Sequence, residues 1–217
     1  MRRVASAIVM ALAICPRASA QQAPRIGPFV VDLHGVVPLF PNNSTALAAS
    51  RGIDDVTDLP GHGLGVDAGA QIYLLRFRAV TLGIGGNLMT GRSRSTPPMP
   101  AAAQPRVGRA VTERFTSIAP QISLNFGNSY GWSYLSGGIG PATWFLVPDG
   151  ATATAADEEK IKTINYGGGA RWFKKKHVGF SFDIRFYAIN PGTPVGTYLG
   201  GSPRTTLLVI GAGVSVK

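Results

Sequence analysis

The sequence predicts an all-β fold, a closed antiparallel up-and-down barrel of eight strands. Apolar and polar residues alternate along about eight segments, and the connections between these segments alternate between short and long. No stretch after residue 20 approaches the ~20 consecutive apolar residues of a membrane-spanning helix. Because successive side chains of a strand point to opposite faces, the alternation gives each strand one apolar and one polar face.

The first twenty residues have the layout of a secretory signal peptide. Met1-Arg2-Arg3 is a positively charged start, an apolar run follows from Val4 to Ile14, and Ala18-Ser19-Ala20 is a small-residue cleavage signal. We therefore expect a cleaved signal peptide over residues 1–20 and a single barrel domain over residues 21–217.

The composition excludes several classes of function. Cys15, the only cysteine, lies inside the signal segment, so the mature chain offers no disulfide, thiol nucleophile or thiolate metal site. Lipidation of Cys15 is the alternative to cleavage after Ala20, although Ile14 is bulky where a small residue is favoured. With 28 glycines and only 15% charged residues, the chain is unusual for an aqueous globule. Export and the apolar strand faces argue against nucleic acid as a partner, despite a formal net charge of +10.

The first four expected strands set mainly valine, leucine and isoleucine against glycine, serine, threonine, asparagine and aspartate. The fifth alternates less cleanly because Pro141 lies within it. The sixth and seventh form a hairpin whose apolar face is crowded with aromatic residues, and the eighth gathers leucine, isoleucine and valine on one side. The eight segments are residues 29–37, 64–74, 80–90, 112–126, 132–147, 163–172, 178–188 and 205–216.

The connections provide the second signal. Short turns are expected around residues 76–77, 127–129 and 174–176, whereas residues 38–62, 91–110, 148–159 and 190–203 form long connections. In an up-and-down barrel these lengths place all the long loops at one end and all the short turns at the other, as in outer-membrane barrels.

The polar faces decide between lipid outside and a lipocalin-like barrel with its apolar face inside. They consist mostly of small residues, which suit the narrow lumen of an eight-stranded barrel, and the apolar faces carry almost no charge. We therefore expect a transmembrane barrel with its apolar face toward lipid. Aromatic residues near strand ends are expected to form interfacial girdles, namely Phe29, Phe126, Trp132, Trp144, Trp172 and Phe186.

One hairpin resembles a known family. The stretches Asn165-Tyr166-Gly167-Gly168-Gly169 and Asp183-Ile184-Arg185-Phe186-Tyr187, with Gly179 before the second, look like a hairpin of the small OmpA/OmpX-like outer-membrane β-barrel domain family. The Gly-rich stretch from Tyr134 to Gly140 is similar to the family's fifth strand. The chain departs from the family at Ser181, where arginine is typical, and at Lys217, where a terminal aromatic residue is common.

The polar faces together predict an ion-paired lumen. Buried charge is tolerated when it is paired and hydrogen-bonded, so aspartates should meet arginines there. Such a network is either a structural plug or part of a path for protons or small solutes. Its expected members are Asp32, His34, Asp67, Gln71, Gln121, Asn125, Asn165, Arg171, Asp183 and Arg185.

The second long connection is basic. Arginine pairs bidentately with phosphate, so these side chains are candidate contacts for lipopolysaccharide. They are Arg92, Arg94, Arg106 and Arg109. The expected partners are therefore outer-membrane lipid and lipopolysaccharide, together with the barrel-assembly machinery of a Gram-negative cell envelope, and the barrel is expected to be a monomer.

No motif indicates catalysis or a cofactor. His34, His62 and His177 fall on a strand, a long loop and a short turn, and none has a serine or carboxylate at a telling spacing. We expect a non-enzymatic outer-membrane barrel, without cofactor or metal, that has a structural, membrane-anchoring or surface-interaction role. The alternatives are a narrow porin-like pore for small solutes and a soluble periplasmic lipid-binding barrel.

Overall fold

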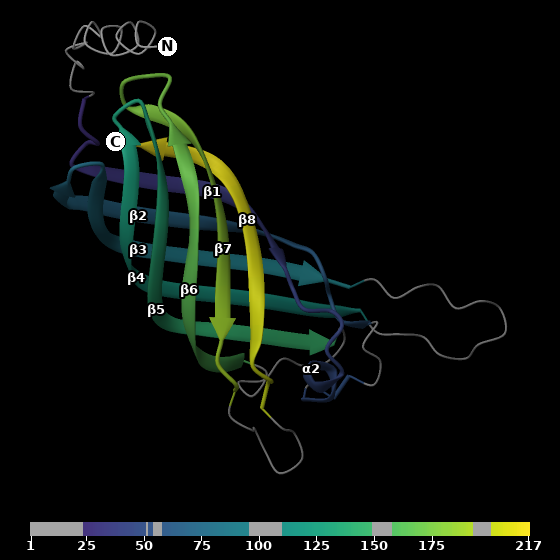
Figure 1. The fold of residues 1–217 in the computed structure, drawn as a ribbon. Coiled ribbons are helices and arrows are strands. Elements are labelled where there is room, and N and C mark those ends of the chain that lie inside the picture. Colours follow the sequence, from purple (N-terminus) through teal and green to yellow (C-terminus); the bar gives the residue numbers. More distant parts are fainter. Residues whose placement is uncertain (1–23, 51, 54–57, 96–109, 149–157, 193–200) are drawn as a thin grey trace, which may run out of the picture.

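The computed structural model describes residues 24–50, 52–53, 58–95, 110–148, 158–192 and 201–217. Within these residues eight strands form one closed antiparallel barrel in chain order, which confirms the expected fold class (Figure 1). The expected signal peptide, residues 1–20, lies outside the described residues. The elements are β1 (Phe29–Leu39), α2 (Thr45–Ser50), β2 (Gly63–Phe77), β3 (Val80–Arg94), β4 (Val111–Asn128), β5 (Gly131–Pro148), β6 (Glu158–Trp172), β7 (Val178–Ile189) and β8 (Thr205–Val216).

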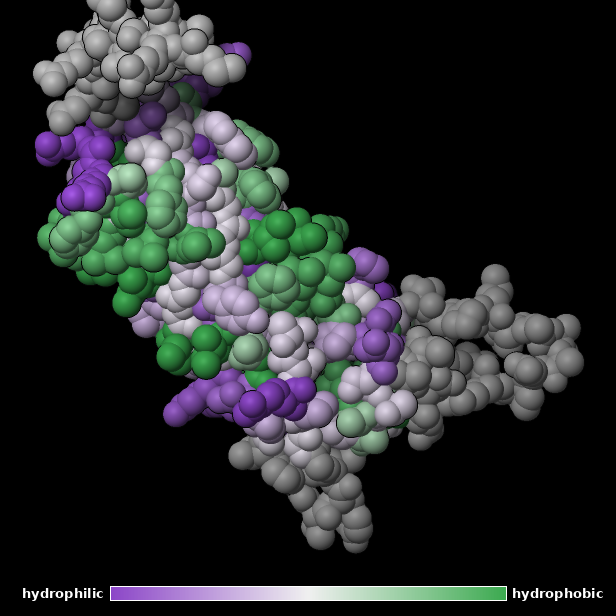
Figure 2. Space-filling view, viewed as in Figure 1, coloured by the Kyte–Doolittle hydropathy of each residue, from purple (hydrophilic) through white to green (hydrophobic). Residues whose placement is uncertain are grey.

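Alternation in the sequence becomes alternation between the two faces of the barrel wall. Along β1, buried residues from Val30 onward alternate with exposed ones, and the other strands follow the same rule over most of their length. The register places Ile72, Ile84 and Ile122 side by side on the outer face. In Figure 2, hydrophobic residues (green) cover much of the wall and hydrophilic residues (purple) gather toward its ends.

Pairing of the first strand with the last completes the barrel. β1 pairs with β8 from Val31–Val216 to Leu39–Leu208, and with β2 on its other side. Because every strand has two neighbours, the sheet has no open edge whose backbone N–H and C=O groups would lack partners. No helix in the described part of the chain is long and apolar enough to cross a membrane.

Several strands extend further toward the long connections than expected. β3 continues to Arg94 and pairs with β4 through Arg92–Arg114 and Arg94–Thr112. Arg92 and Arg94 therefore lie on a strand and not in the second long loop, because the β3–β4 ladder continues beyond the last apolar residue of β3. We call this end of the barrel the loop end and the opposite one the turn end.

The first short turn also differs in position from the expectation. β2 and β3 pair as far as Phe77–Val80, so the turn consists of Arg78 and Ala79 and not of residues 76–77. Arg78 has a φ of 51°, a left-handed conformation that is uncommon for a residue with a Cβ. A register shift between Tyr73 and Leu75 precedes this turn.

Two of the six aromatic residues expected at the membrane interface are inside the barrel. Trp132 and Trp144 belong to the inward face of β5 and are buried, so they cannot form a girdle. The expectation was wrong for these two because the less regular alternation of β5 hid which face carries its tryptophans. Phe29, Phe126, Trp172 and Phe186 are exposed on the wall.

The first long connection packs against the loop end of the barrel and is not simply a polar external loop. The side chain of Ser44 accepts a hydrogen bond from the backbone N–H of Leu47 (3.1 Å), which caps the short helix α2. Leu47, Ile53 and Leu59 are buried in one cluster with residues of the barrel wall. Apolar residues scattered through a polar segment therefore supply part of the core.

Introducing a charged residue in the middle of the outer wall tests whether lipid or water surrounds the barrel, because only lipid makes the charge costly. Ile122 lies near the middle of β4 and is 61% exposed. We expect Ile122→Lys to lower the free energy of unfolding in lipid vesicles by about 2–4 kcal/mol, the cost of a lysine near the bilayer midplane. Urea titration followed by tryptophan fluorescence measures it.

Tyr130→Lys is the matched control, because it places the same charge on an exposed position of the β4–β5 turn. Its cost should stay within about 1 kcal/mol, as at the membrane interface. Equal and small effects of the two substitutions would indicate that water covers the wall.

Candidate functional site

The polar residues expected in the lumen are all buried inside the barrel. They form a middle layer between an aromatic layer at the turn end and an apolar layer at the loop end. The ten residues are Asp32, His34, Asp67, Gln71, Gln121, Asn125, Asn165, Arg171, Asp183 and Arg185.

Arg171 and Asp32 form a bidentate ion pair near the turn end. The Arg171 guanidinium donates from Nε to Asp32 Oδ1 (2.9 Å) and from Nη2 to Asp32 Oδ2 (2.6 Å). Ser215 donates a further hydrogen bond to Asp32, and the guanidinium lies 3.8 Å from the centre of the Tyr134 ring. The pair joins β6 to β1, and the hydrogen bond from Ser215 adds β8, so both strands of the barrel closure are connected to it.

Arg185 is the centre of a second cluster. Its guanidinium donates two hydrogen bonds to Asp183 (3.1 and 3.0 Å), one to Asn165 Oδ1 (3.1 Å) and one to Ser136 Oγ (2.9 Å). Gln121 also donates to Asn165 Oδ1 (2.9 Å), and Tyr134 donates from its hydroxyl to Asp183 (2.7 Å). Asp183 thus neutralises the charge of Arg185, and neutral partners on the neighbouring strands β4 to β6 complete the hydrogen bonding of the pair.

Two inward-facing glycines of β6 make room for these side chains. Gly167 lies in register between Ser136 and Arg185, and Gly169 lies between Tyr134 and Asp183. A Cβ on Gly169 would overlap the backbone oxygen of Phe182 and lie 2.8 Å from the Tyr134 hydroxyl. The glycines of this hairpin therefore leave the space that the ion-paired side chains of the lumen occupy.

A third cluster, centred on His34, was not found from the sequence. His34 Nε2 lies 2.8 Å from Ser181 Oγ, and His34 Nδ1 lies 3.7 Å from Asp67 Oδ1. Asn87 donates to the other oxygen of Asp67 (2.7 Å). These residue types form nucleophile–base–carboxylate relays in hydrolases, but Ser181 and His34 are fully or almost fully buried among the lumen side chains.

The remaining polar members of the lumen bond to one another. Ser123 donates from its hydroxyl to Gln71 Oε1 (2.8 Å), and the Asn125 amide donates to Ser123 Oγ (2.9 Å) and to the backbone oxygen of Thr81 (3.1 Å). The structure thus brings the ten expected residues together in several hydrogen-bonded clusters. The described residues contain no group of three or more His, Cys, Asp or Glu side chains placed to hold a metal ion.

Aromatic rings close the turn end of the lumen. Trp132 and Phe173 stack with their centres 4.8 Å apart, and Tyr73 packs edge-on against Trp132. The Lys217 ammonium lies 4.1 Å from the centre of the Phe173 ring and donates to the backbone oxygen of Ser129. Partial burial lowers the pKa of Lys217, consistent with a side chain that turns over the end of the barrel.

The loop end of the lumen is filled by apolar side chains. Phe115, Trp144 and Tyr187 from the wall lie in one cluster with residues of the first long connection. Trp144 donates from its indole nitrogen to the buried carboxylate of Glu113 (2.6 Å). The lumen is thus occupied along its length by the chain's own side chains.

The outer wall at the loop end carries an exposed set of cations. Arg92 and Arg94 face outward from β3, and Arg114 lies directly opposite Arg92 on β4. A hollow of about 560 Å³ is lined by Arg92, Arg94, His62, the backbone around Gly63, and the apolar residues Val37 and Leu64. The two other arginines expected here, Arg106 and Arg109, lie outside the described residues.

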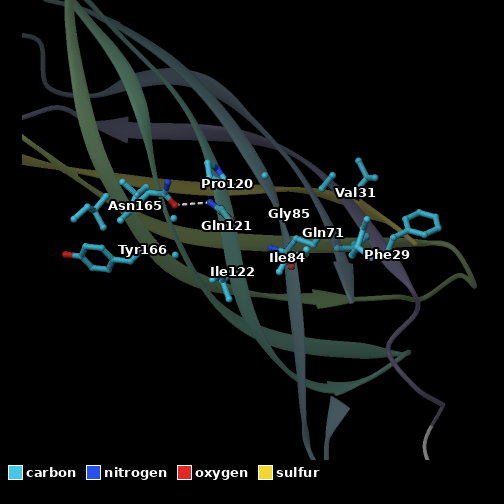
Figure 3. Close-up of a pocket in the computed structure, with 18 residues that line it drawn as sticks. Phe29, Val31, Gln71, Ile84, Gly85, Pro120, Gln121, Ile122, Asn165 and Tyr166 are labelled. Carbon is cyan, nitrogen blue, oxygen red and sulfur yellow. Dashed lines mark hydrogen bonds between the residues drawn. The ribbon is translucent and has the colours of Figure 1, made fainter. Parts of the chain in front are cut away.

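The wall itself is one strand thick, polar inside and apolar outside. In Figure 3, Gln121 and Asn165 point toward each other and are joined by a hydrogen bond, whereas Ile122 and Tyr166, their neighbours in the chain, are half-exposed on the outer face. An apolar hollow of about 1050 Å³ lies against this part of the wall. Adjacent residues of one strand therefore lie in different environments, one in the polar lumen and the next on the apolar outer face.

These features define the class of the protein: the chain has the fold of the small eight-stranded outer-membrane β-barrels. No family model matches the chain, and a search of curated proteins finds no match to it. Among solved structures it is similar to Neisserial surface protein A, with 14% identity and a TM-score of 0.51 over 88% of this chain and 97% of that one. This likeness shows the fold alone.

Two further solved structures give weaker matches. The attachment invasion locus protein Ail of Yersinia pestis, in complex with the heparin analogue sucrose octasulfate, has 11% identity and a TM-score of 0.48 over 86% of this chain and 97% of that one. The outer membrane protein OprG of Pseudomonas aeruginosa has 9% identity and a TM-score of 0.48 over 89% and 97%.

The ion pair between Arg171 and Asp32 allows a test of the lumen network. We expect Asp32→Ala to lower the free energy of unfolding by about 3–5 kcal/mol, because Arg171 would keep a buried charge without its carboxylate partner. Adding Arg171→Met should recover part of this loss. Urea titrations in lipid vesicles, combined as a double-mutant cycle, measure the coupling between the two residues.

Glu158→Ala is the control for this cycle, because Glu158 is an exposed carboxylate on β6. Its removal should change the free energy of unfolding by no more than about 0.5 kcal/mol. If the two single lumen substitutions and the double substitution were additive, Arg171 and Asp32 would not stabilise the barrel as a pair.

Proposed function

We propose that the protein is an integral outer-membrane β-barrel, without enzymatic activity, that has a structural, membrane-anchoring or surface-interaction role. One observation carries the proposal. The large apolar residues of the strands are exposed around the wall, while the aspartates and central arginines of the same strands are buried inside. An apolar solvent such as lipid favours this arrangement, and water does not.

The alternative of a soluble periplasmic lipid-binding barrel requires the opposite arrangement. In a soluble barrel the apolar faces line the interior and the polar faces meet water. Here Leu64 is 76% exposed and Ile139 is 64% exposed, whereas Asn165 and Arg171 are buried. This distribution supports the membrane proposal over the soluble one.

The absence of an enzymatic role is part of the proposal, supported by the position of the His34 cluster. Ser181 and His34 lie inside the barrel, and a substrate would have to pass the aromatic layer or the apolar layer to reach them. The same layers argue against a narrow pore, because side chains occupy both ends of the lumen.

Anchoring at the loop end is proposed to involve lipopolysaccharide. Like charges directly opposite each other on neighbouring strands are destabilising, as for Arg92 and Arg114, unless an anion lies between them. The nearby hollow combines cations with Val37 and Leu64, which suits a phosphate attached to an acyl chain. Insertion as a monomer by the barrel-assembly machinery belongs to the same proposal.

Location is tested by separating the membranes of expressing cells on a density gradient. The proposal predicts that the protein sediments with the outer membrane and needs detergent for extraction. Release with the soluble periplasm would contradict it and favour the lipid-binding alternative. Reproducible single-channel conductance of the purified protein in planar bilayers would instead favour the pore.

If the arginines at the loop end contact lipopolysaccharide, removing their charges should reduce the amount of lipopolysaccharide bound. In the variant Arg92→Gln/Arg94→Gln/Arg114→Gln, the amount of lipopolysaccharide that co-purifies in mild detergent should fall by at least about fivefold, because each arginine near an anionic surface contributes about 1 kcal/mol. Silver-stained gels of the purified protein, which resolve lipopolysaccharide from phospholipid, measure it.

The charge-matched control is Lys174→Gln/Lys175→Gln/Lys176→Gln, which removes three cations from the β6–β7 turn at the opposite end. This variant should keep the lipopolysaccharide of the unmodified protein. Equal lipopolysaccharide content in both variants and the unmodified protein would overturn the proposed contact.

A further inference from the structure

Among the described residues, the exposed charged side chains at the turn end of the barrel are all cations. Exposed cations lie before β1, at the end of β2, in the β2–β3 turn and in the β6–β7 turn, and none of these segments contains an aspartate or glutamate. Among the side-chain carboxylates of the described residues, Asp32 is near this end, and it is buried and paired with Arg171. The exposed cations are Arg25, Arg76, Arg78, Lys174, Lys175 and Lys176.

These cations surround the barrel and do not form one compact patch. In the closed strand order, the β2–β3 turn, with Arg78 and the neighbouring Arg76 of β2, lies across the barrel from the β6–β7 turn with Lys174–Lys176. The segment before β1 reaches the β4–β5 turn, where Ser129 donates from its backbone N–H to Pro24 O (2.9 Å), so it places Arg25 on a third side. We call these six residues the basic ring.

Large apolar residues follow the basic ring directly along the wall. Phe77 is 65% exposed next to Arg76 and Arg78, and Trp172 is 51% exposed just before Lys174–Lys176. Trp172 stacks against Phe180 and Phe182, with ring centres 6.1 and 6.2 Å away. Cations beside exposed aromatic rings have the amphipathic pattern of a surface at the boundary between lipid tails and headgroups.

We propose that the basic ring binds the phosphate headgroups of anionic phospholipids in the leaflet at the turn end. This inference rests on the proposed membrane location and adds a second lipid contact at the end opposite to the lipopolysaccharide site. Charges on three sides of a rim are matched by headgroups that surround the barrel. A single compact ligand or protein would reach only one side at a time.

Backbone geometry supports a role for charge at this rim. Arg78 occupies a two-residue turn with a φ of 51°, a conformation that glycine or asparagine adopts at lower cost. Arg76 donates from Nε to the backbone oxygen of Arg78 (3.3 Å), so its guanidinium lies next to this turn. Lys217 is not part of the ring, because its ammonium lies over Phe173 and bonds to Ser129.

Trp172 provides a local probe for the test. Trp132 and Trp144, the other two tryptophans of the chain, are buried, so lipid-borne bromine quenches mainly Trp172. The full protein is reconstituted in phosphatidylcholine vesicles, and either brominated phosphatidylglycerol or brominated phosphatidylcholine is added at equal mole fraction. The ratio of the two quenching constants gives the preference for the anionic lipid next to the β6–β7 turn.

We expect a preference for phosphatidylglycerol of about fivefold, the factor that corresponds to one lysine or arginine near an anionic surface. In Lys174→Gln/Lys175→Gln/Lys176→Gln the preference should approach parity, while the conservative variant Lys174→Arg/Lys175→Arg/Lys176→Arg retains it. Raising the salt concentration to about 1 M should also reduce it, because the Debye length falls to ~3 Å.

Arg92→Gln/Arg94→Gln/Arg114→Gln is the control at the loop end and should keep the full preference at Trp172. Equal quenching by both lipids in the unmodified protein, or an unchanged preference in the glutamine variant of the turn, would overturn the role of the basic ring. If neither lipid quenches Trp172, the wall is not in contact with lipid, and the proposed membrane location fails as well.

Discussion

Closure of the sheet is the constraint on which the rest of the structure depends. A barrel in which β8 pairs with β1 leaves no backbone edge, so its wall can meet an apolar solvent without unpaired N–H and C=O groups. Closure also divides the side chains of the strands into two sets, because alternate residues along a strand point into the lumen and out of the barrel. Between the two ends of the barrel the outer set is mainly apolar, and the inner set holds most of the polar side chains of the strands.

The inner set fits because its charges are paired and its neighbours are small. Arg171 with Asp32 and Arg185 with Asp183 each bring a guanidinium and a carboxylate together, and Gly167 and Gly169 leave space for them. The aromatic layer and the apolar layer then close the two ends of this polar interior. A lumen filled in this way supports the proposed anchoring role over the pore alternative.

Much of the fold could be predicted from the sequence. Period-two alternation shows which residues share a face of the wall, and the loop lengths indicate the up-and-down order of the strands. The members of the lumen followed from this alternation as well. Their partners did not, because a contact such as His34 with Ser181, 147 positions apart, depends on the stagger between strands. The extension of β3 to Arg94 and the packing of Leu47 into the loop end were missed, since ladder pairing continues past the apolar residues and a polar segment masks single buried side chains.

The central claim is that the apolar wall faces lipid, and refolding tests it most directly. The protein, unfolded in urea, is diluted either into lipid vesicles or into buffer without lipid, and heat-modifiable gel mobility and circular dichroism report folding. We predict β-sheet structure and a mobility that changes on boiling only when vesicles are present. A monodisperse, folded barrel in buffer without lipid or detergent would contradict the account.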